Sequence, residues 1–118
     1  MSGNTQGIPF NHLYYAQKVF QERLVKENLP QDNVGLFTYH VSAMVEEMGE
    51  VMKADKRWKT HRNTAYNPEE KLDELADVFI TAMNLAIYSG FSSHDIENAI
   101  LNKIKINNER LDDHDSNC

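Results

Sequence analysis

The chain has 118 residues, which suffices for one domain with a modest core and is too few for two ordinary domains. Its composition, 41% hydrophobic and 25% charged with 5 Gly and 3 Pro, is ordinary for a globular helical protein. A formal charge of −6 argues against binding of duplex nucleic acid, because proteins that wrap DNA usually carry a basic face.

The sequence indicates neither export nor membrane insertion. The N-terminal MSGNTQGIPFNH lacks a basic start and a long apolar run, and no apolar stretch approaches the roughly 18 residues that cross a bilayer. The single cysteine, Cys118, excludes a disulfide framework and a cysteine zinc cluster. We expect a cytoplasmic protein without a membrane partner.

Four segments with apolar residues at helical spacing predict an all-α fold and a single domain over residues 1–118. The first predicted helix covers about residues 11–28 and ends before Pro30, which cannot continue a helix. The second covers about residues 35–58 and is followed by the polar stretch KTHRNTAY. The third covers about residues 68–89, because Asn67 can cap it and Pro68 suits its first position.

The fourth predicted helix runs from about residue 93 to 111, and residues 112–118 are expected to form a frayed acidic tail. Short loops between successive helices favour antiparallel neighbours and therefore a helical bundle. The third helix is apolar over more than half of its circumference, so one neighbouring helix does not cover it. We therefore expect a second copy of the chain to complete the bundle.

Acidic residues gather on one face of each of the two central helices. At about 100° per residue, Glu46, Glu47 and Glu50 share one face of the second helix, where Glu47 borders the apolar stripe. On the third helix, Glu74 and Asp77 lie opposite the apolar stripe. The i,i+3 spacing thus recurs on two helices that can pack side by side, and the acids stand near apolar positions rather than beside lysines at i+4.

Several ionised carboxylates that converge in a partly buried cleft repel one another unless protons or hard cations compensate. Oxygen ligands without His or Cys suit Mg²⁺ or its substitute Mn²⁺ better than zinc or iron. Because Mg²⁺ often shares its ligand shell with substrate phosphates, the carboxylates suggest a nucleotide substrate. The alternative is a set of solvated acids, since single acidic pairs at this spacing are common on exposed helices.

The motif E-E-x-x-E at residues 46–50, followed by E-x-x-D at residues 74–77, resembles the signature of the MazG-like all-α nucleoside triphosphate pyrophosphohydrolases. The resemblance covers about residues 35–110. It implies a house-cleaning hydrolase that converts (deoxy)nucleoside triphosphates to monophosphates and pyrophosphate with Mg²⁺. It also implies a homo-oligomer, dimer or tetramer, built through an intersubunit helical bundle.

By position, the resemblance implies that Glu47, Glu50, Glu74 and Asp77 bind the metal. Glu46 and Glu47 are the catalytic candidates. Glu46 is implied to be either a ligand of a further metal or the base that orients the attacking water.

Three residues of the fourth helix also follow a pattern of the family. Lys103, Asn107 and Arg110, spaced i, i+4 and i+7, resemble the K-x-x-x-N-x-x-R pattern with which related enzymes hold phosphates, often from the neighbouring subunit. The alternative is a solvated helix end whose cations complement the helix dipole.

Three further residues are candidates for substrate binding. Lys53 and Trp58 belong to a basic segment between the acidic motifs, where a cation can neutralise a triphosphate and an indole can stack on a base. The alternative is a basic loop with Trp58 packed on its own helix end. Asn84 lies on the acidic face, where it either contacts the sugar or base or is satisfied across the bundle interface.

Other functions stay open at this point. A relative with a narrower substrate, dUTPase-like or a phosphoribosyl-nucleotide pyrophosphatase, has the same chemistry. A non-catalytic helical module for oligomerisation or partner binding would need only the apolar faces. A di-iron bundle would usually need Glu-x-x-His pairs, which neither acidic motif supplies.

Overall fold

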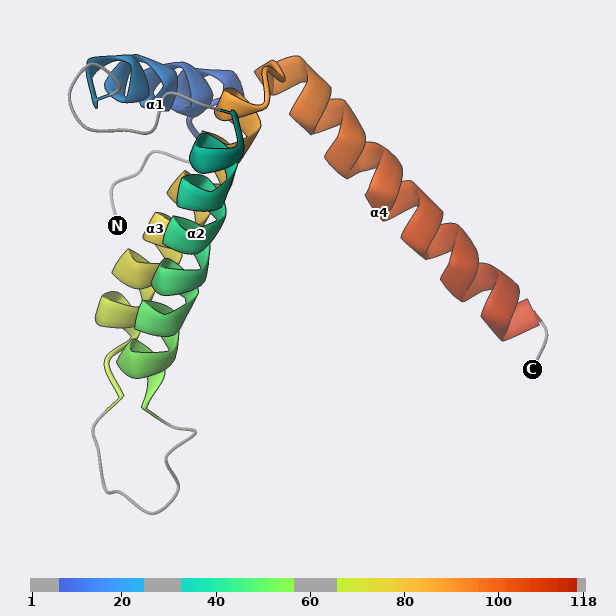
Figure 1. Cartoon of the computed structure of the whole chain (residues 1–118). Helices are drawn as coiled ribbons and strands as arrows, with labels where there is room; N and C mark the ends of the chain where they lie inside the picture. The colour runs from blue at the N-terminus through green and yellow to red at the C-terminus, as the bar shows by residue number, and fades with distance from the viewer. Residues whose placement is uncertain (1–6, 25–32, 57–65, 117–118) are drawn as a thin grey trace.

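The computed structural model describes residues 7–24, 33–56 and 66–116. Within these ranges the chain forms four α-helices and no strand, so the predicted all-α class is confirmed. The helices are α1 (Phe10–Leu24), α2 (Asn33–Asp55), α3 (Pro68–Tyr88) and α4 (Ser93–Ser116). As Figure 1 shows, α2 and α3 form an antiparallel hairpin, α1 crosses one end of it, and α4 extends away from it.

Local signals set the ends of the central helices. The side chain of Asn67 accepts hydrogen bonds from the backbone N–H groups of Glu69 (3.0 Å) and Glu70 (3.4 Å), and Pro68 occupies the first turn, as predicted. Helix α2 ends where Lys56 adopts a left-handed backbone with φ 52°, which breaks the helical ladder. The helix was predicted to continue to about residue 58, but Lys56 is already outside it, and residues 57–58 lie outside the described residues. The predicted end of the first helix near residue 28 also lies outside the described residues.

The turn between α3 and α4 directs α4 away from the hairpin. Gly90 has φ 87°, a backbone conformation that glycine adopts without steric cost. The side chain of Asp95 accepts from the Ser92 N–H at 2.9 Å, and the Ser92 hydroxyl accepts from the Asp95 N–H at 3.1 Å, so the two residues cap α4 reciprocally. The axes of α3 and α4 differ by 115°. The antiparallel packing expected from the short loop is therefore wrong for this helix pair.

Helix α4 is also longer than predicted. It continues to Ser116, whereas residues 112–118 were expected to form a frayed tail. The stretch from Leu111 to Ser116 holds neither Gly nor Pro, so no residue in it has a strong tendency to end the helix.

The described residues bury very little. Four residues are buried: Tyr14, His40, Ala54 and Thr81. The chain exposes 9465 Å², whereas a monomeric globular protein of 13.6 kDa exposes about 6,600 Å². Its radius of gyration is 18.2 Å, against about 13.5 Å for a compact domain of this length. The described part of one copy therefore lacks an ordinary hydrophobic core.

The apolar stripes of α2 and α3 are only partly covered within one chain. Leu72 and Phe79 on α3 are 66% and 70% exposed. On α2, the exposed members of the stripe are Phe37, Val45, Met48 and Met52. The faces that carry Glu47 and Asp77 take part in the contact between the two helices. Contacts across the hairpin join His40 to Tyr88, Glu47 to Asp77, and Asp55 to Lys71, which defines its antiparallel register.

Among the described residues, no single helix is long and apolar enough to cross a membrane. The bent pair α3 and α4 meets the length and composition requirement only when its two helices are taken together.

Candidate metal centre

Three carboxylates from α2 and α3 come close together. One carboxylate oxygen each from Glu47, Glu74 and Asp77 lies within 4.8 Å of the others, and we call these residues the acid cluster. Glu74 and Asp77 share a face because they are three residues apart on α3, and the antiparallel register brings Glu47 opposite them. Glu47 and Glu74 are half-buried, whereas Asp77 is exposed.

The surroundings raise the pKa of two carboxyl groups of the acid cluster. Partial burial is the largest cause for Glu47, followed by the negative charges of Asp77 and Glu74. Partial burial is also the largest cause for Glu74, followed by Asp77 and Glu50. Both effects disfavour the ionised form, so a cation that enters the acid cluster relieves a repulsion already present in the protein.

The donor set of the acid cluster fits a hard divalent cation. All three groups offer carboxylate oxygens, the ligands that Mg²⁺ and Mn²⁺ prefer, and no His or Cys takes part. Three protein ligands leave room for water and substrate oxygens in the octahedral shell that Mg²⁺ demands.

The other two acids predicted for the site lie beside the acid cluster. Glu50 follows Glu47 by one turn of α2, and its Oε1 lies 3.4 Å from the Lys53 ammonium, whose side chain is 75% exposed. Its negative charge nevertheless raises the pKa of Glu74. Glu46 is exposed and raises the pKa of Glu47. Thus three of the four predicted metal ligands converge, and Glu50 stands next to them.

Asn84 is already engaged within the chain. Its side-chain oxygen accepts a hydrogen bond of 2.7 Å from the Gln17 amide of α1, so the half-buried Asn84 helps to dock α1 on α3. The sequence alone left Asn84 open between a contact to the sugar or base and satisfaction across the bundle interface. Trp58, the predicted stacking residue, lies outside the described residues.

The three predicted phosphate-binding residues are not brought to the acid cluster within one chain. Lys103, Asn107 and Arg110 lie exposed on α4. Helix α4 runs away from the hairpin, as Figure 1 shows, and its main contacts are with α1.

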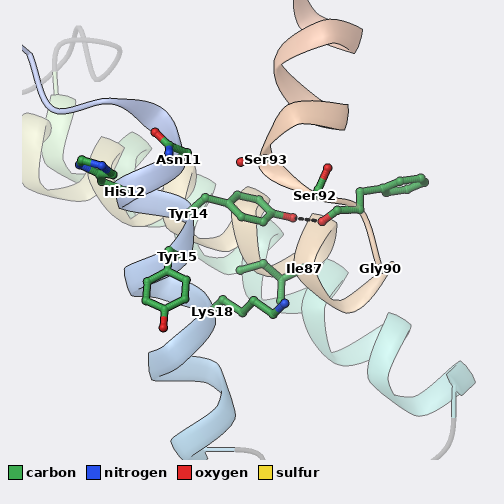
Figure 2. A pocket seen from close by; sticks show the side chains of 10 residues that line it. Asn11, His12, Tyr14, Tyr15, Lys18, Ile87, Gly90, Ser92 and Ser93 are labelled. Atoms are coloured by element: carbon green, nitrogen blue, oxygen red, sulfur yellow. Dashed lines mark hydrogen bonds between the residues drawn. The ribbon is translucent and has the colours of Figure 1, made fainter.

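A cavity that the sequence did not predict lies between α1 and the turn from α3 to α4. It has a volume of about 590 Å³, and its lining includes Tyr15, Lys18, Ile87 and Ser92 (Figure 2). The Tyr14 hydroxyl donates to the backbone oxygen of Phe91 at 2.6 Å and holds α1 against this turn. Ile87 follows Asp77 by ten residues, about 15 Å along α3, so the cavity is separate from the acid cluster.

No protein-family model matches the chain, and no significant match is found among the curated proteins or the solved structures.

Proposed function

We propose that this protein is a Mg²⁺-dependent nucleoside triphosphate pyrophosphohydrolase of the MazG-like kind, which converts (deoxy)nucleoside triphosphates to monophosphates and pyrophosphate. The observation that carries the proposal is the convergence of Glu47, Glu74 and Asp77 from two helices within 4.8 Å. Such a concentration of partly buried negative charge is unfavourable without a cation. Mg²⁺ in turn is the usual companion of a triphosphate.

In this proposal the acid cluster holds the cation, and Glu50 supports it from the next turn of α2. When bound, Mg²⁺ supplies positive charge that offsets the phosphate charge of the substrate. Glu46, exposed beside Glu47, orients the attacking water or binds a further cation. Water adds to phosphorus, the anhydride bond between the α- and β-phosphoryl groups breaks, and a carboxylate accepts the proton of the water.

The proposed active form contains more than one copy of the chain. Exposed apolar stripes on α2 and α3 and an accessible surface of 9465 Å² support this, because a stable domain buries far more apolar area. A neighbouring copy is also the route by which Lys103, Asn107 and Arg110 of α4 can reach the triphosphate, since the α4 of the same chain diverges from the acid cluster.

The decisive experiment incubates the protein with a panel of canonical and modified (d)NTPs, including dUTP, with and without Mg²⁺, and assays pyrophosphate against orthophosphate. We expect pyrophosphate in the presence of Mg²⁺ and none after chelation with EDTA. A Glu50→Gln variant is expected to fold and to lose most of the activity. If no substrate yields pyrophosphate, the enzymatic proposal is wrong.

A second candidate function is a non-catalytic oligomerisation module. The specific observation in its favour is the exposure of the α2 and α3 stripes, which an oligomer covers whether or not the acids are functional. This candidate predicts that Mg²⁺ together with a non-hydrolysable nucleotide leaves the melting temperature unchanged. The enzymatic proposal predicts an increase, because a ligand that binds only the folded state stabilises it by mass action.

A further inference from the structure

An ion pair closes the end of the hairpin nearest the acid cluster. The Lys71 ammonium of α3 lies 2.8 Å from Oδ2 of Asp55, the last residue of α2, and the two side chains are only 25% and 19% exposed. The same ammonium lies 5.7 Å from the centroid of the Tyr66 ring. Both contacts draw the positive charge of Lys71 toward the loop end of the hairpin.

Lys71 is also positioned to reach the acid cluster. It precedes Glu74 by three residues on α3, which places the two side chains about 60° apart around the helix and one turn apart along it. Lysine and glutamate at this spacing commonly form an ion pair. A lysine that turned toward Glu74 would therefore act as an internal counter-ion and compete with any cation for the carboxylates.

We propose that Asp55 is a positioning residue, which holds the Lys71 ammonium away from Glu74 and thereby keeps the acid cluster available to a divalent cation. The inference rests on the proposed function, because it assumes that the acid cluster binds a metal. The ion pair would then do more than hold α2 and α3 together. The position of the Lys71 ammonium would determine whether the carboxylates of the acid cluster are already neutralised.

The test measures Mn²⁺ binding to the full-length protein by isothermal titration calorimetry, with no nucleotide present. Asp55→Asn removes the carboxylate partner that lies 2.8 Å from the Lys71 ammonium. It is expected to weaken Mn²⁺ binding about tenfold, because one unit of positive charge can then move to within a helical turn of the ligands. Adding Lys71→Met to Asp55→Asn removes the competing charge and is expected to restore binding to within about twofold of wild type. Asp55→Glu keeps the ion pair and is expected to bind like wild type.

Asp73→Asn is the matched control for the loss of a negative charge. Asp73 adjoins Glu74 and contributes to raising its pKa, but it does not hold Lys71 in this structure. Its substitution is expected to weaken binding far less than Asp55→Asn. Circular dichroism establishes that each variant is folded, and Lys71→Gln replaces Lys71→Met in the double variant if the latter fails to fold.

The possible results separate the two proposals. If the double variant binds Mn²⁺ as weakly as Asp55→Asn, the ion pair is only a structural clamp and the inference is wrong. It is equally wrong if Asp55→Asn binds like wild type. If the wild-type protein itself binds no Mn²⁺, the proposed metal centre fails, and the positioning role of Asp55 fails with it.

Discussion

Glu47 and Glu74 hold negative charge where the folded protein disfavours it. Their carboxyl pKa values are raised above 4.5, their ordinary value, by partial burial and by neighbouring carboxylates. The folded state therefore binds protons more tightly than the unfolded state. This contribution to stability is fully present below pH 4.5 and is lost as the pH rises through the raised pKa values. At neutral pH, without a cation, the acid cluster destabilises the fold.

Glu74→Gln is expected to raise the melting temperature of the metal-free protein at pH 7, because it removes a repelling charge without changing side-chain volume. The same variant should lose the stabilisation by Mg²⁺, and its proposed activity should fall by at least roughly 100-fold. Loss of a residue that only supports a metal ligand costs up to about 100-fold, so loss of the ligand itself should cost at least that much. Thermal unfolding with and without Mg²⁺ provides the measurement. Glu109→Gln on exposed α4 is the control, and a metal-free Glu74→Gln protein that melts below wild type would contradict the repulsion argument.

His40 introduces a pH dependence of another kind. It is only 4% exposed, its ring lies 5.6 Å from that of Tyr88 and 5.2 Å from that of Tyr39, and burial lowers its pKa below 6.5. The folded state thus favours the neutral imidazole, and the unfolded state binds a proton first as the pH falls. Stability from His40 is therefore present above pH 6.5 and is lost as the pH falls from there toward the lowered value.

His40→Phe keeps an aromatic ring in this position and removes the titration. We expect the melting temperature of wild type to fall relative to that of His40→Phe between pH 7.5 and about 5.5. Glu47 and Glu74 act in the opposite direction in both proteins, so the difference between the two proteins isolates His40. Parallel melting temperatures over this range would show that the imidazole is not desolvated.

Among the helices, α3 has the best-defined start. Its cap combines the two hydrogen bonds accepted by Asn67 with Pro68 in the first turn and two acids near the positive end of the helix dipole. The start of α3 sets where Glu74 and Asp77 lie around and along the helix axis. The cap therefore contributes to the geometry of the acid cluster as well as to helix stability.

Asn67→Ala is expected to destabilise the protein by about 1 kcal/mol, the usual effect of losing an N-cap side chain. Urea unfolding monitored by circular dichroism measures it. Asn67→Asp, which retains an oxygen acceptor, should stay close to wild type. If both substitutions have the same effect, the hydrogen bonds from Glu69 and Glu70 do not contribute as assigned.

At the scale of the whole molecule, the main feature is the large number of apolar side chains that one chain leaves exposed. Leu72 and Phe79 stand on the outer side of α3, and α4 carries exposed Ile100, Leu101 and Ile104 on an arm that leaves the hairpin. Burying such faces between copies would supply the apolar contact that one chain lacks. We propose an oligomer because one chain leaves these apolar side chains without a partner surface.

Phe79→Lys is expected to shift the protein from an oligomer toward the monomer mass of 13.6 kDa and to lower its melting temperature, because a charge in the proposed interface opposes association. Size-exclusion chromatography with light scattering measures the mass. Ile8→Lys, an equally drastic change at a 66% exposed residue that precedes α1, is the control and should leave the mass unchanged. A wild-type protein that runs as a monomer would refute the oligomer.

The sequence by itself determined the features that depend on neighbours along the chain. Helix starts and ends follow from Asn67, Pro68 and Gly90 because capping and backbone preference act within a few residues. The i,i+3 pair of Glu74 and Asp77 likewise follows from helical geometry alone. These signals sufficed for the all-α class and for placing Glu74 and Asp77 on one face of α3.

Only the tertiary structure decided which faces of the helices meet. The periodicity predicted apolar stripes at the core, yet Leu72 and Phe79 of α3 stay exposed in one chain, because the covering of a face depends on all partners of a helix and not on its own pattern. The ion pair of Asp55 with Lys71 and the hydrogen bond of Gln17 with Asn84 join residues 16 and 67 positions apart. The direction of α4 depends on the Gly90 turn and on its docking to α1. Helical spacing encodes none of these relations, because it describes one helix at a time.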